Sequence, residues 1–385
     1  MPAIDAVLRA LSIALGMAWE ITWALILGFL LSAVVQAVVS KAEMTRLLPD
    51  AGARSLTIAT LLGAASSSCS YAAVALARSI FRKGGDFRAA IAFEFASTNL
   101  VIELGIILAL LIGWQFTLGE FVGGPVMIVI LALLFRRFLR PELVEEARTQ
   151  AERGLKGSME GHAEMDMSVS GGSLLARISS PAGFTAISHY FVMDWAAIWK
   201  DIAAGLLIAG ALAAWVPNEF WQRLFLTSNP TLAAVWGPVI GPLIAVISFV
   251  CSIGNVPLAA VLWNGGISFG GVLAFIFADL IILPILNIYR RYYGRRMTVF
   301  LGLTFYVAMT GAAYLVQGLF GLLGLIPTDR HAFVVEASIS LNYTSVLNVV
   351  FLTLAAVLIW RFRRTGGAQM LAMMDLSSDE MSAIG

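Results

Sequence analysis

The 385-residue chain is 59% hydrophobic and only 13% charged, with a formal net charge of +1 at pH 7 and a mean hydropathy of +0.86. This composition excludes an ordinary soluble globular domain and places the chain in a lipid bilayer. A net charge near zero gives no hint of nucleic acid, so we expect no nucleic-acid partner. The first residues, Met1–Asp5, carry no cationic side chain. We therefore expect a retained first helix and a multi-pass protein of a bacterial inner (plasma) membrane.

Long apolar runs predict the membrane-spanning helices. A run of about 18 or more apolar residues is long enough to cross the hydrocarbon core. In chain order, such runs occur at 12–39, 87–112, 117–139, 194–216, 267–290, 298–318 and 343–361. The predicted fold class is therefore an all-α polytopic membrane protein.

Two further apolar stretches, 55–81 and 231–264, are interrupted by small and polar residues. The interruptions are Ala64–Ser70 in the first stretch, and Gly237-Pro238, Gly241-Pro242 and Cys251–Pro257 in the second. Glycine and proline continue a helix poorly. In hydrocarbon, the freed backbone groups must face protein or a water-filled cavity. We therefore predict two broken helices or re-entrant hairpins that form the functional site.

Four basic clusters indicate the topology. They are Arg82/Lys83/Arg88, Arg136/Arg137/Arg140, Arg290/Arg291/Arg295/Arg296 and Arg361/Arg363/Arg364. If both interrupted stretches are re-entrant, all four clusters face the cytoplasm, as the positive-inside rule requires. Each half of the chain then crosses the membrane three times, the halves are inverted relative to each other, and one extra helix follows.

The chain contains two copies of one pattern. Cys69-Ser70, Gly84-Gly85 and Ala92–Ser97 correspond to Cys251-Ser252, Gly265-Gly266 and Ala274–Asp279, and upstream Met17, Trp19 and Trp23 correspond to Met193, Trp195 and Trp199. Internal repeats of interrupted apolar segments are typical of secondary transporters, whose site lies between the repeats. The predicted regions are a membrane repeat at 1–140, a cytoplasmic polar linker at 141–190, a second membrane repeat at 191–328, an additional C-terminal transmembrane helix at 329–362 and a cytoplasmic tail at 363–385.

The two cysteines, Cys69 and Cys251, are the first candidates for substrate binding. Equivalent positions of inverted repeats meet near the midplane, where two thiols would bind trivalent arsenic, antimony or a thiophilic metal. The alternative is that each cysteine is a small packing residue at a tight crossing. Uncharged polar groups near the two interruptions would line the same site or bond between helices. These are Ser68, Ser70, Asn99 and Asn255.

Acidic residues within predicted spans are candidates for ion coupling, because ionisable groups in hydrocarbon are costly and usually functional. These residues are Glu20, Glu94, Glu103 and Asp279. Glu94 and Asp279 fit a proton-coupling role best, since Asp279 occupies the place of Ser97 in the first copy. Structural pairing with Arg78, Arg82 or a polar neighbour is the alternative.

A soft-ligand cluster lies in the linker, at Met159, His162, Met165 and Met167. Thioether and imidazole groups at this spacing could collect Cu(I) or Ag(I). Phosphate-binding glycine loops, HExxH and GxSxG are absent from the sequence, so ATPase, metalloprotease and serine hydrolase activities have no support. We expect no cofactor and no enzymatic activity.

The region from Ser68-Cys69-Ser70 through Arg82-Lys83-Gly84 to Ala92–Ser97, with its echo from Cys251 to Asp279, resembles the predicted-permease family that includes the organoarsenical efflux permeases. The resemblance covers about 11–320 and is weak in the linker. It implies export of trivalent organoarsenicals across the cytoplasmic membrane by means of membrane cysteines, which correspond here to Cys69 and, in the second copy, to Cys251. Many members have a Cys-Ser-Cys motif, where this chain has Ser67-Ser68-Cys69-Ser70.

These observations favour an inner-membrane permease that moves a small solute or metalloid by alternating access. A membrane thiol redox enzyme, and a channel or sensor without uphill transport, stay open as alternatives. The sequence leaves open the substrate, the direction, the coupling ion and whether the protein is a monomer or a homo-oligomer.

Overall fold

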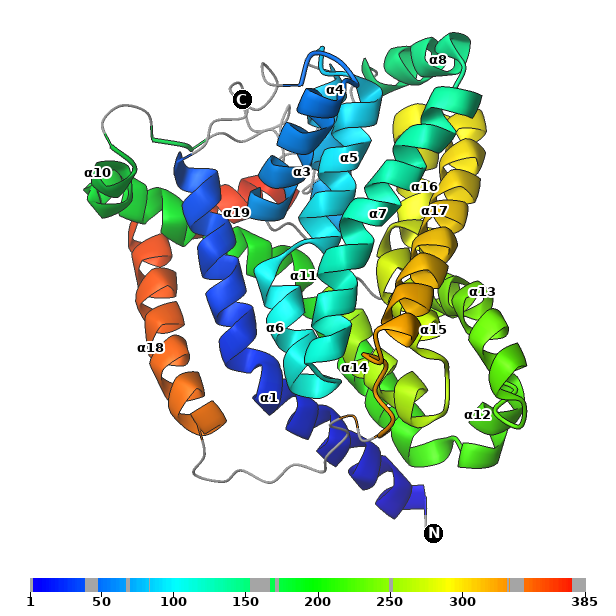
Figure 1. The fold of residues 1–385 in the computed structure, drawn as a ribbon. Coiled ribbons are helices and arrows are strands. Elements are labelled where there is room, and N and C mark those ends of the chain that lie inside the picture. The colour runs from blue at the N-terminus through cyan, green and yellow to red at the C-terminus, as the bar shows by residue number, and fades with distance from the viewer. Residues whose placement is uncertain are drawn as a thin grey trace.

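The computed structural model describes residues 3–38, 48–66, 70–82, 84–152, 167–169, 173–248, 252–330, 332 and 343–375. Within these ranges the chain forms helices and no β-strand (Figure 1). Seven segments are long and apolar enough to cross a membrane: Ile21–Val38, Phe87–Leu111, Trp114–Phe138, Pro230–Ser248, Phe269–Tyr293, Arg295–Leu322 and Thr344–Arg364. The prediction of an all-helical polytopic membrane protein is therefore confirmed.

Two long helices, α1 (Ala3–Val38) and α11 (Pro181–Trp215), pack antiparallel along one side of the bundle (Figure 1). The indole Nε1 of Trp215 donates to the carbonyl of Ala6 at one end, over 3.0 Å, and Gln36 Nε2 donates to Asp194 Oδ2 at the other, also over 3.0 Å. Both helices begin earlier than predicted. Helix α11 starts at Pro181 because the Ser180 hydroxyl caps it by accepting from the Gly183 amide at 2.9 Å.

The first interrupted stretch is a re-entrant hairpin of α3 (Ala53–Ser66) and α4 (Ser70–Arg82). Its two ends adjoin, because the Asp86 amide after α4 donates to the Leu48 carbonyl before α3 over 3.0 Å. Helices of 14 and 13 residues are each about 20 Å long, shorter than the hydrocarbon core of about 30 Å. The hairpin therefore enters the bundle and returns to the same end.

The second interrupted stretch, α13 (Pro230–Ser248) and α14 (Ser252–Asn264), has the same form. A Cβ on Gly266, just after α14, would lie 2.5 Å from Thr227 Cγ2, just before α13. The start and the end of this hairpin are thus neighbours. The two hairpins enter the bundle from opposite ends (Figure 1).

Helix α13 is not broken at Gly237-Pro238 or Gly241-Pro242, contrary to the expectation that these pairs interrupt the helix. The prolines free two carbonyls, because Pro238 cannot donate to Ala234 and Pro242 cannot donate to Pro238. Both are satisfied from α17 (Arg295–Leu322): Gln317 Nε2 donates to the Ala234 carbonyl over 2.9 Å, and Thr310 Oγ1 to the Pro238 carbonyl over 3.3 Å. Helix α13 runs unbroken to Ser248, and residues 249–251 lie outside the described residues.

Two predicted spans that we expected to be single helices, 87–112 and 267–290, are each interrupted. The first consists of α5 (Phe87–Asn99) and α6 (Ile102–Leu111), with Leu100 and Val101 between them. The second consists of α15 (Phe269–Phe277), a 3₁₀ turn η1 (Ala278–Ile281) and α16 (Leu283–Tyr293). Pro284 stands at the start of α16, where a missing amide costs no intrahelical bond. Both interruptions lie inside the bundle, where neighbouring protein covers the freed backbone.

The ends of α4, α7 (Trp114–Phe138) and α16 and the starts of α5 and α17, which carry the described basic residues of the first three clusters, lie at one end of the bundle (Figure 1). Helix α7 leads there into α8 (Pro141–Glu152), and Glu146 Oε1 of α8 accepts from Arg296 over 2.6 Å. At the same end, Gln150 Nε2 donates to the Arg291 carbonyl over 3.0 Å. The last long helix, α18 (Tyr343–Arg364), contacts the beginning of α11, where Arg361 Nε donates to Thr185 Oγ1 over 3.1 Å. Lys83 lies outside the described residues.

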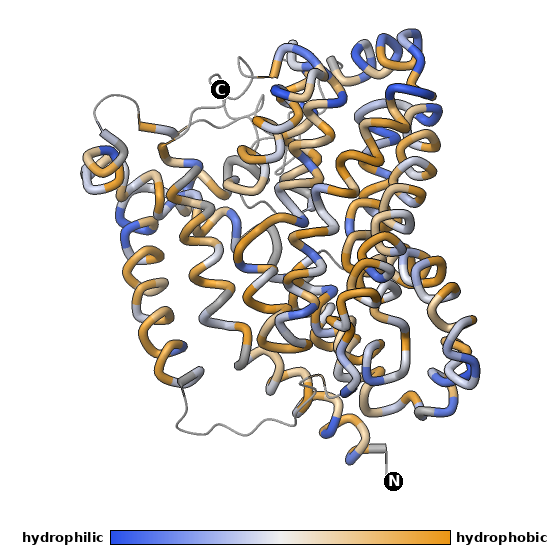
Figure 2. The backbone as a smooth tube through the Cα atoms, in the orientation of Figure 1, coloured by the Kyte–Doolittle hydropathy of each residue, from blue (hydrophilic) through white to orange (hydrophobic). Residues whose placement is uncertain are grey.

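Short helices complete the two ends of the bundle. They are α10 (Leu174–Ser179), α12 (Asn218–Leu224) and α19 (Gly367–Asp375). Figure 2 shows a largely hydrophobic middle between more hydrophilic ends. This distribution matches a bilayer, in which a hydrocarbon core lies between two polar interfacial regions.

The shared basic end predicts the sidedness of the protein. In a cysteine-free background, Gln150→Cys on α8 should react with a membrane-impermeant maleimide only after the cells are permeabilised, because the positive-inside rule predicts that the basic end faces the cytoplasm. Asp329→Cys, beyond α17, should react in intact cells. Labelling of both positions from the same side would contradict the arrangement.

The two freed carbonyls of α13 predict a stability effect. Gln317→Leu and Thr310→Val should each lower the free energy of unfolding by about 1–3 kcal/mol, because each leaves a carbonyl in an apolar bundle without its donor. Thermal unfolding in detergent measures the change. The control is Thr353→Val, an exposed hydroxyl that bonds only within its own helix, and it should have little effect.

Candidate functional site

The centre of the bundle is organised around the carboxyl of Asp279. Ser70 Oγ, at the start of α4, donates to Asp279 Oδ2 over 2.6 Å, and both side chains are fully buried. Asp279 lies in η1, the 3₁₀ turn that interrupts the second broken span. The side chains of Thr98, Asn99 and Ser252 also surround this carboxyl. Both hairpins and both broken spans thus meet at one acid.

Glu94 is the second buried acid of the site. It lies on α5 with no exposed surface, and the hydroxyl of Tyr289 on α16 donates to its Oε1. Its other oxygen, Oε2, has no hydrogen-bond partner among the described protein groups. The bond joins the first broken span to the second on the side of the site nearer the basic end.

Glu120 is a third buried acid, and the sequence analysis missed it. It lies on α7, has no exposed surface, and neither of its carboxyl oxygens has a described hydrogen-bond partner. It is close enough to Asp279 for the two charges to interact. A signal was present, since Glu120 is an ionisable residue inside the predicted span 117–139.

The remaining predicted polar residues lie near this centre. Asn99 Nδ2 donates to Thr98 Oγ1 over 2.9 Å and to the Phe95 carbonyl over 3.3 Å, while its Oδ1 has no described partner. Asn255 Oδ1 accepts from Ser248 Oγ over 3.3 Å, and its Nδ2 has none. Asn255 lies near the start of α14, two residues beyond Ile253. The structure therefore places both amides at the tips of the interrupted segments.

Several predicted residues lie outside the described residues, and for them the predictions stand as made. These are Ser68, Cys69, Cys251, Met159, His162 and Met165, together with the side chain of Glu20. Met167 is half-buried, and its backbone amide donates to the Tyr190 hydroxyl over 2.9 Å. Within the part of the chain that the structure describes, no group of three His, Cys, Asp or Glu side chains is placed to hold a metal ion.

Two other charged residues of the sequence analysis contact different parts of the bundle. Glu103, at the start of α6, packs against α1, where a Cβ on Gly28 would lie 2.2 Å from its own Cβ. The guanidinium of Arg78 lies over the Tyr292 ring at 4.4 Å and donates to the Ala151 carbonyl over 2.8 Å. Polar neighbours bond to the acids of the site: Ser70 donates to Asp279, and Tyr289 donates to Glu94.

The polar atoms of the site that lack a hydrogen-bond partner are mostly acceptors. Five acceptor oxygens lack a described donor, namely Glu94 Oε2, Asn99 Oδ1, both oxygens of Glu120 and Asp279 Oδ1, against two unpartnered donors, Asn255 Nδ2 and the Tyr293 hydroxyl. Buried polar groups are nearly always satisfied in proteins. An excess of acceptors suits a ligand that brings positive charge or hydrogen-bond donors.

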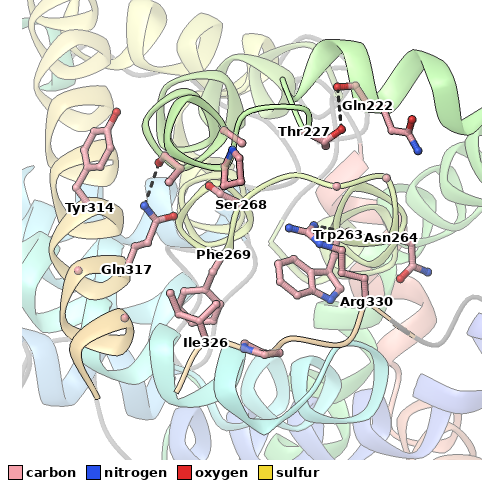
Figure 3. A pocket seen from close by; sticks show the side chains of 18 of the residues that line it. Gln222, Thr227, Trp263, Asn264, Ser268, Phe269, Tyr314, Gln317, Ile326 and Arg330 are labelled. Atoms are coloured by element: carbon pink, nitrogen blue, oxygen red, sulfur yellow. Dashed lines mark hydrogen bonds between the residues drawn. The ribbon is translucent and has the colours of Figure 1, made fainter. Parts of the chain in front are cut away.

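A cavity of about 790 Å³ opens at the end of the bundle opposite the basic clusters (Figure 3). Arg330 borders it, with its guanidinium 4.2 Å from the centre of the Trp263 ring and donating to the Trp263 carbonyl over 3.0 Å and the Ile267 carbonyl over 2.8 Å. Burial lowers the pKa of Arg330, and the guanidinium stays charged at neutral pH. Phe269, the first residue of α15, lines the cavity.

Apolar helices around a buried polar centre built from interrupted segments define the class, which is that of multi-pass membrane transporters. Residues 6–318 match the predicted-permease family. Since the match covers most of the chain, the protein belongs to this family. It is 64% identical over 342 residues to the Mycobacterium tuberculosis protein named "Putative permease Rv2963", with 89% of this chain and 84% of that protein covered. No solved structure matches the chain significantly.

The bond between Ser70 and Asp279 predicts an energetic coupling. Ser70→Ala should cost about 1–3 kcal/mol of stability, because it leaves a buried acceptor without its donor. In a double-mutant cycle with Asp279→Asn, the two effects should be non-additive by about 0.5–3 kcal/mol. The same cycle between Thr304→Val, on α17, and Asp279→Asn is the control, since Thr304 bonds within its own helix, and additive effects are expected there.

Proposed function

We propose that this permease is a secondary transporter that moves a small solute by alternating access between two inverted halves. The observation that carries the proposal is the convergence at Asp279 of hairpins that enter from opposite ends of the bundle. Ser70 of the first hairpin bonds to this carboxyl over 2.6 Å, and Ser252 of the second lies beside it. Rocking of one half against the other would expose this centre to each side in turn.

The order of the elements supports the division into two halves. In the first half, α3 and α4 pack against α5, and α6 packs against α7; in the second, α13 and α14 pack against α15, and α16 packs against α17. The two longest helices, α1 and α11, precede these sets and pack against each other. The proposed boundaries remain 1–140 and 191–328, with α18 as an addition to the second half.

A thiophilic solute is the proposed substrate. Cys69 and Cys251 directly precede Ser70 and Ser252 in the sequence, the two serines beside the Asp279 carboxyl. Thiols at these positions would bind a trivalent arsenical or another soft species, with Ser68, Asn99 and Asn255 as polar neighbours. Resemblance to the organoarsenical efflux permeases supports export from the cytoplasm as the direction.

Proton coupling is assigned to Glu94 and Asp279. Both carboxyls are fully buried, and an ionised carboxylate in such a place is costly unless it is paired. Loading and release of a proton would therefore change the energy of the two access states by different amounts. That differential is what couples a proton gradient to movement of the solute.

Substitution of the cysteines tests the substrate class. Cys69→Ser and Cys251→Ser should each abolish uptake of a trivalent organoarsenical into everted vesicles, because serine is nearly isosteric but is a hard ligand. Membrane insertion and thermal stability should be unchanged, since the replacement opens no large cavity. Full transport by both variants would mean that the cysteines are packing residues and that the substrate is not thiophilic.

Substitution of the acids separates coupling from binding. In proteoliposomes with an imposed pH gradient, Glu94→Gln and Asp279→Asn should reduce gradient-driven accumulation at least tenfold. Exchange at equal concentrations should persist, because exchange needs binding but no change of protonation. Glu103→Gln is the matched control, as Glu103 is a buried acid that packs against α1, and it should keep both activities. Equal loss of exchange and accumulation would place the two acids in substrate binding instead.

A further inference from the structure

Glu120 has no role in the function proposed so far, and the burial of its unpaired carboxyl needs an explanation. Its side chain has no exposed surface and neither carboxyl oxygen has a described partner. An unpaired ionised carboxylate in an apolar bundle costs several kcal/mol or more. Binding of a proton or another positive ligand removes this cost, because it neutralises the buried charge.

The depths of the three acids follow from the helices that carry them. Helices α7 and α15 begin side by side at the end opposite the basic clusters, since the rings of Phe116 and Phe269 are 4.8 Å apart. Counted from these starts at 1.5 Å per residue, Glu120 lies roughly 9 Å into the bundle and Asp279 roughly 15 Å. Helix α5 begins at the basic end, where the rings of Phe87 and Phe135 are 6.3 Å apart.

By the same count, Glu94 lies roughly 10 Å from the basic end of the bundle. The electrostatic neighbours agree with this order. Asp279 is an electrostatic neighbour of both Glu94 and Glu120. Asp279 is therefore the middle member of a ladder of three carboxyls through the bundle.

Both ends of the ladder approach groups that could pass a proton on. At the far end, Phe269 borders the 790 Å³ cavity, and its Cζ would lie 3.2 Å from a Cβ on Gly119, the residue before Glu120. At the basic end, Tyr289 bonds to Glu94 and stacks with Tyr293 at 6.2 Å. The Tyr293 hydroxyl is buried without a described partner.

We propose that Glu120 is the proton-binding residue on the cavity side of a relay that runs from Glu120 through Asp279 to Glu94. This proposal rests on the coupling role proposed above for Glu94 and Asp279, and it adds the residue through which protons reach them. The proposed ligand is a proton, and competition with sodium in the test below distinguishes it from a metal cation. Each step transfers one proton between carboxyls and leaves the total charge of the relay unchanged.

The surroundings of Glu120 contain few other titratable groups. On the elements packed against α7, the Asp, Glu, Lys, Arg and His residues within the membrane are Glu94 on α5 and Glu103 on α6, and α15 has none. Helix α17 carries Arg295 and Arg296 at its basic end only. The pH response of Glu120 should therefore depend mainly on Asp279.

Labelling with a hydrophobic carbodiimide tests the relay without any substrate. This reagent modifies protonated carboxyls in apolar surroundings, and mass spectrometry of the full-length protein in proteoliposomes locates the modified residues. We expect modification of Glu120 that declines as the pH rises. In Asp279→Asn the half-maximal pH for Glu120 should move down by at least half a unit, because a neighbouring negative charge has been removed. Modification of Glu103, as the internal control, should keep its pH profile.

Three outcomes would overturn the relay. They are no modification of Glu120 at any pH, a Glu120 profile unaffected by Asp279→Asn, and protection by sodium at constant pH, which would assign the site to a metal cation. A functional arm uses Glu120→Gln, which should reduce gradient-driven accumulation at least tenfold while exchange persists. Loss of accumulation in Glu94→Gln and Asp279→Asn, but not in Glu120→Gln, would remove Glu120 from the relay and leave the proposed transport function intact.

Discussion

One hydrogen bond, from the Ser70 hydroxyl to the Asp279 carboxyl, joins the tip of the first hairpin to the interruption of the second broken span. Its length of 2.6 Å is that of a strong bond to a carboxyl. The surrounding residues Thr98, Asn99 and Ser252 come from the other two interrupted segments. The Asp279 carboxyl thus has neighbours at the start of α4, the end of α5 and the start of α14. The position of the site, its burial and its link to both halves all depend on this carboxyl.

The hydrocarbon surroundings explain why polar side chains of one helix donate hydrogen bonds to backbone carbonyls of another. A carbonyl freed by a proline has no water to bond with inside a bilayer, so another helix must supply the donor. Helix α17 does so with Thr310 for Pro238 and Gln317 for Ala234. This packing ties α17 to α13, and a Cβ on Gly241 would lie only 2.4 Å from the Gly271 carbonyl of α15. The two carbonyls freed by the prolines of α13 therefore become contact points with α17.

Much of this architecture follows from sequence, and the exceptions have physical causes. The two interrupted stretches each form a pair of helices, but the residues predicted to interrupt them are largely helical: Gly237-Pro238 and Gly241-Pro242 lie inside α13, and Ser252–Pro257 lie inside α14. The interruption after Asn99 was not predicted, because Leu100 and Val101 are apolar and continue the hydrophobic run. The second break had a signal in Pro284, which we did not use. Glu120 was overlooked inside a strongly apolar run, although its charge alone marks it. Ser70, Asn99 and Asp279 were selected from the sequence, but their meeting point depends on long-range packing that no local pattern encodes.

The central claim is that the tips of the two hairpins meet at the centre of the bundle, and a cross-link between them tests it most directly. The chain has two cysteines, Cys69 and Cys251, one for each hairpin. With a protease site inserted in the linker at 153–166, the protein would be treated in membranes with an oxidant or a short bifunctional thiol reagent, cleaved, and run on a non-reducing denaturing gel. The account predicts that the two halves stay joined and separate on reduction, since a disulfide requires Cα atoms within about 7 Å. Complete separation without reduction, when both thiols still react with maleimide after denaturation, would contradict it.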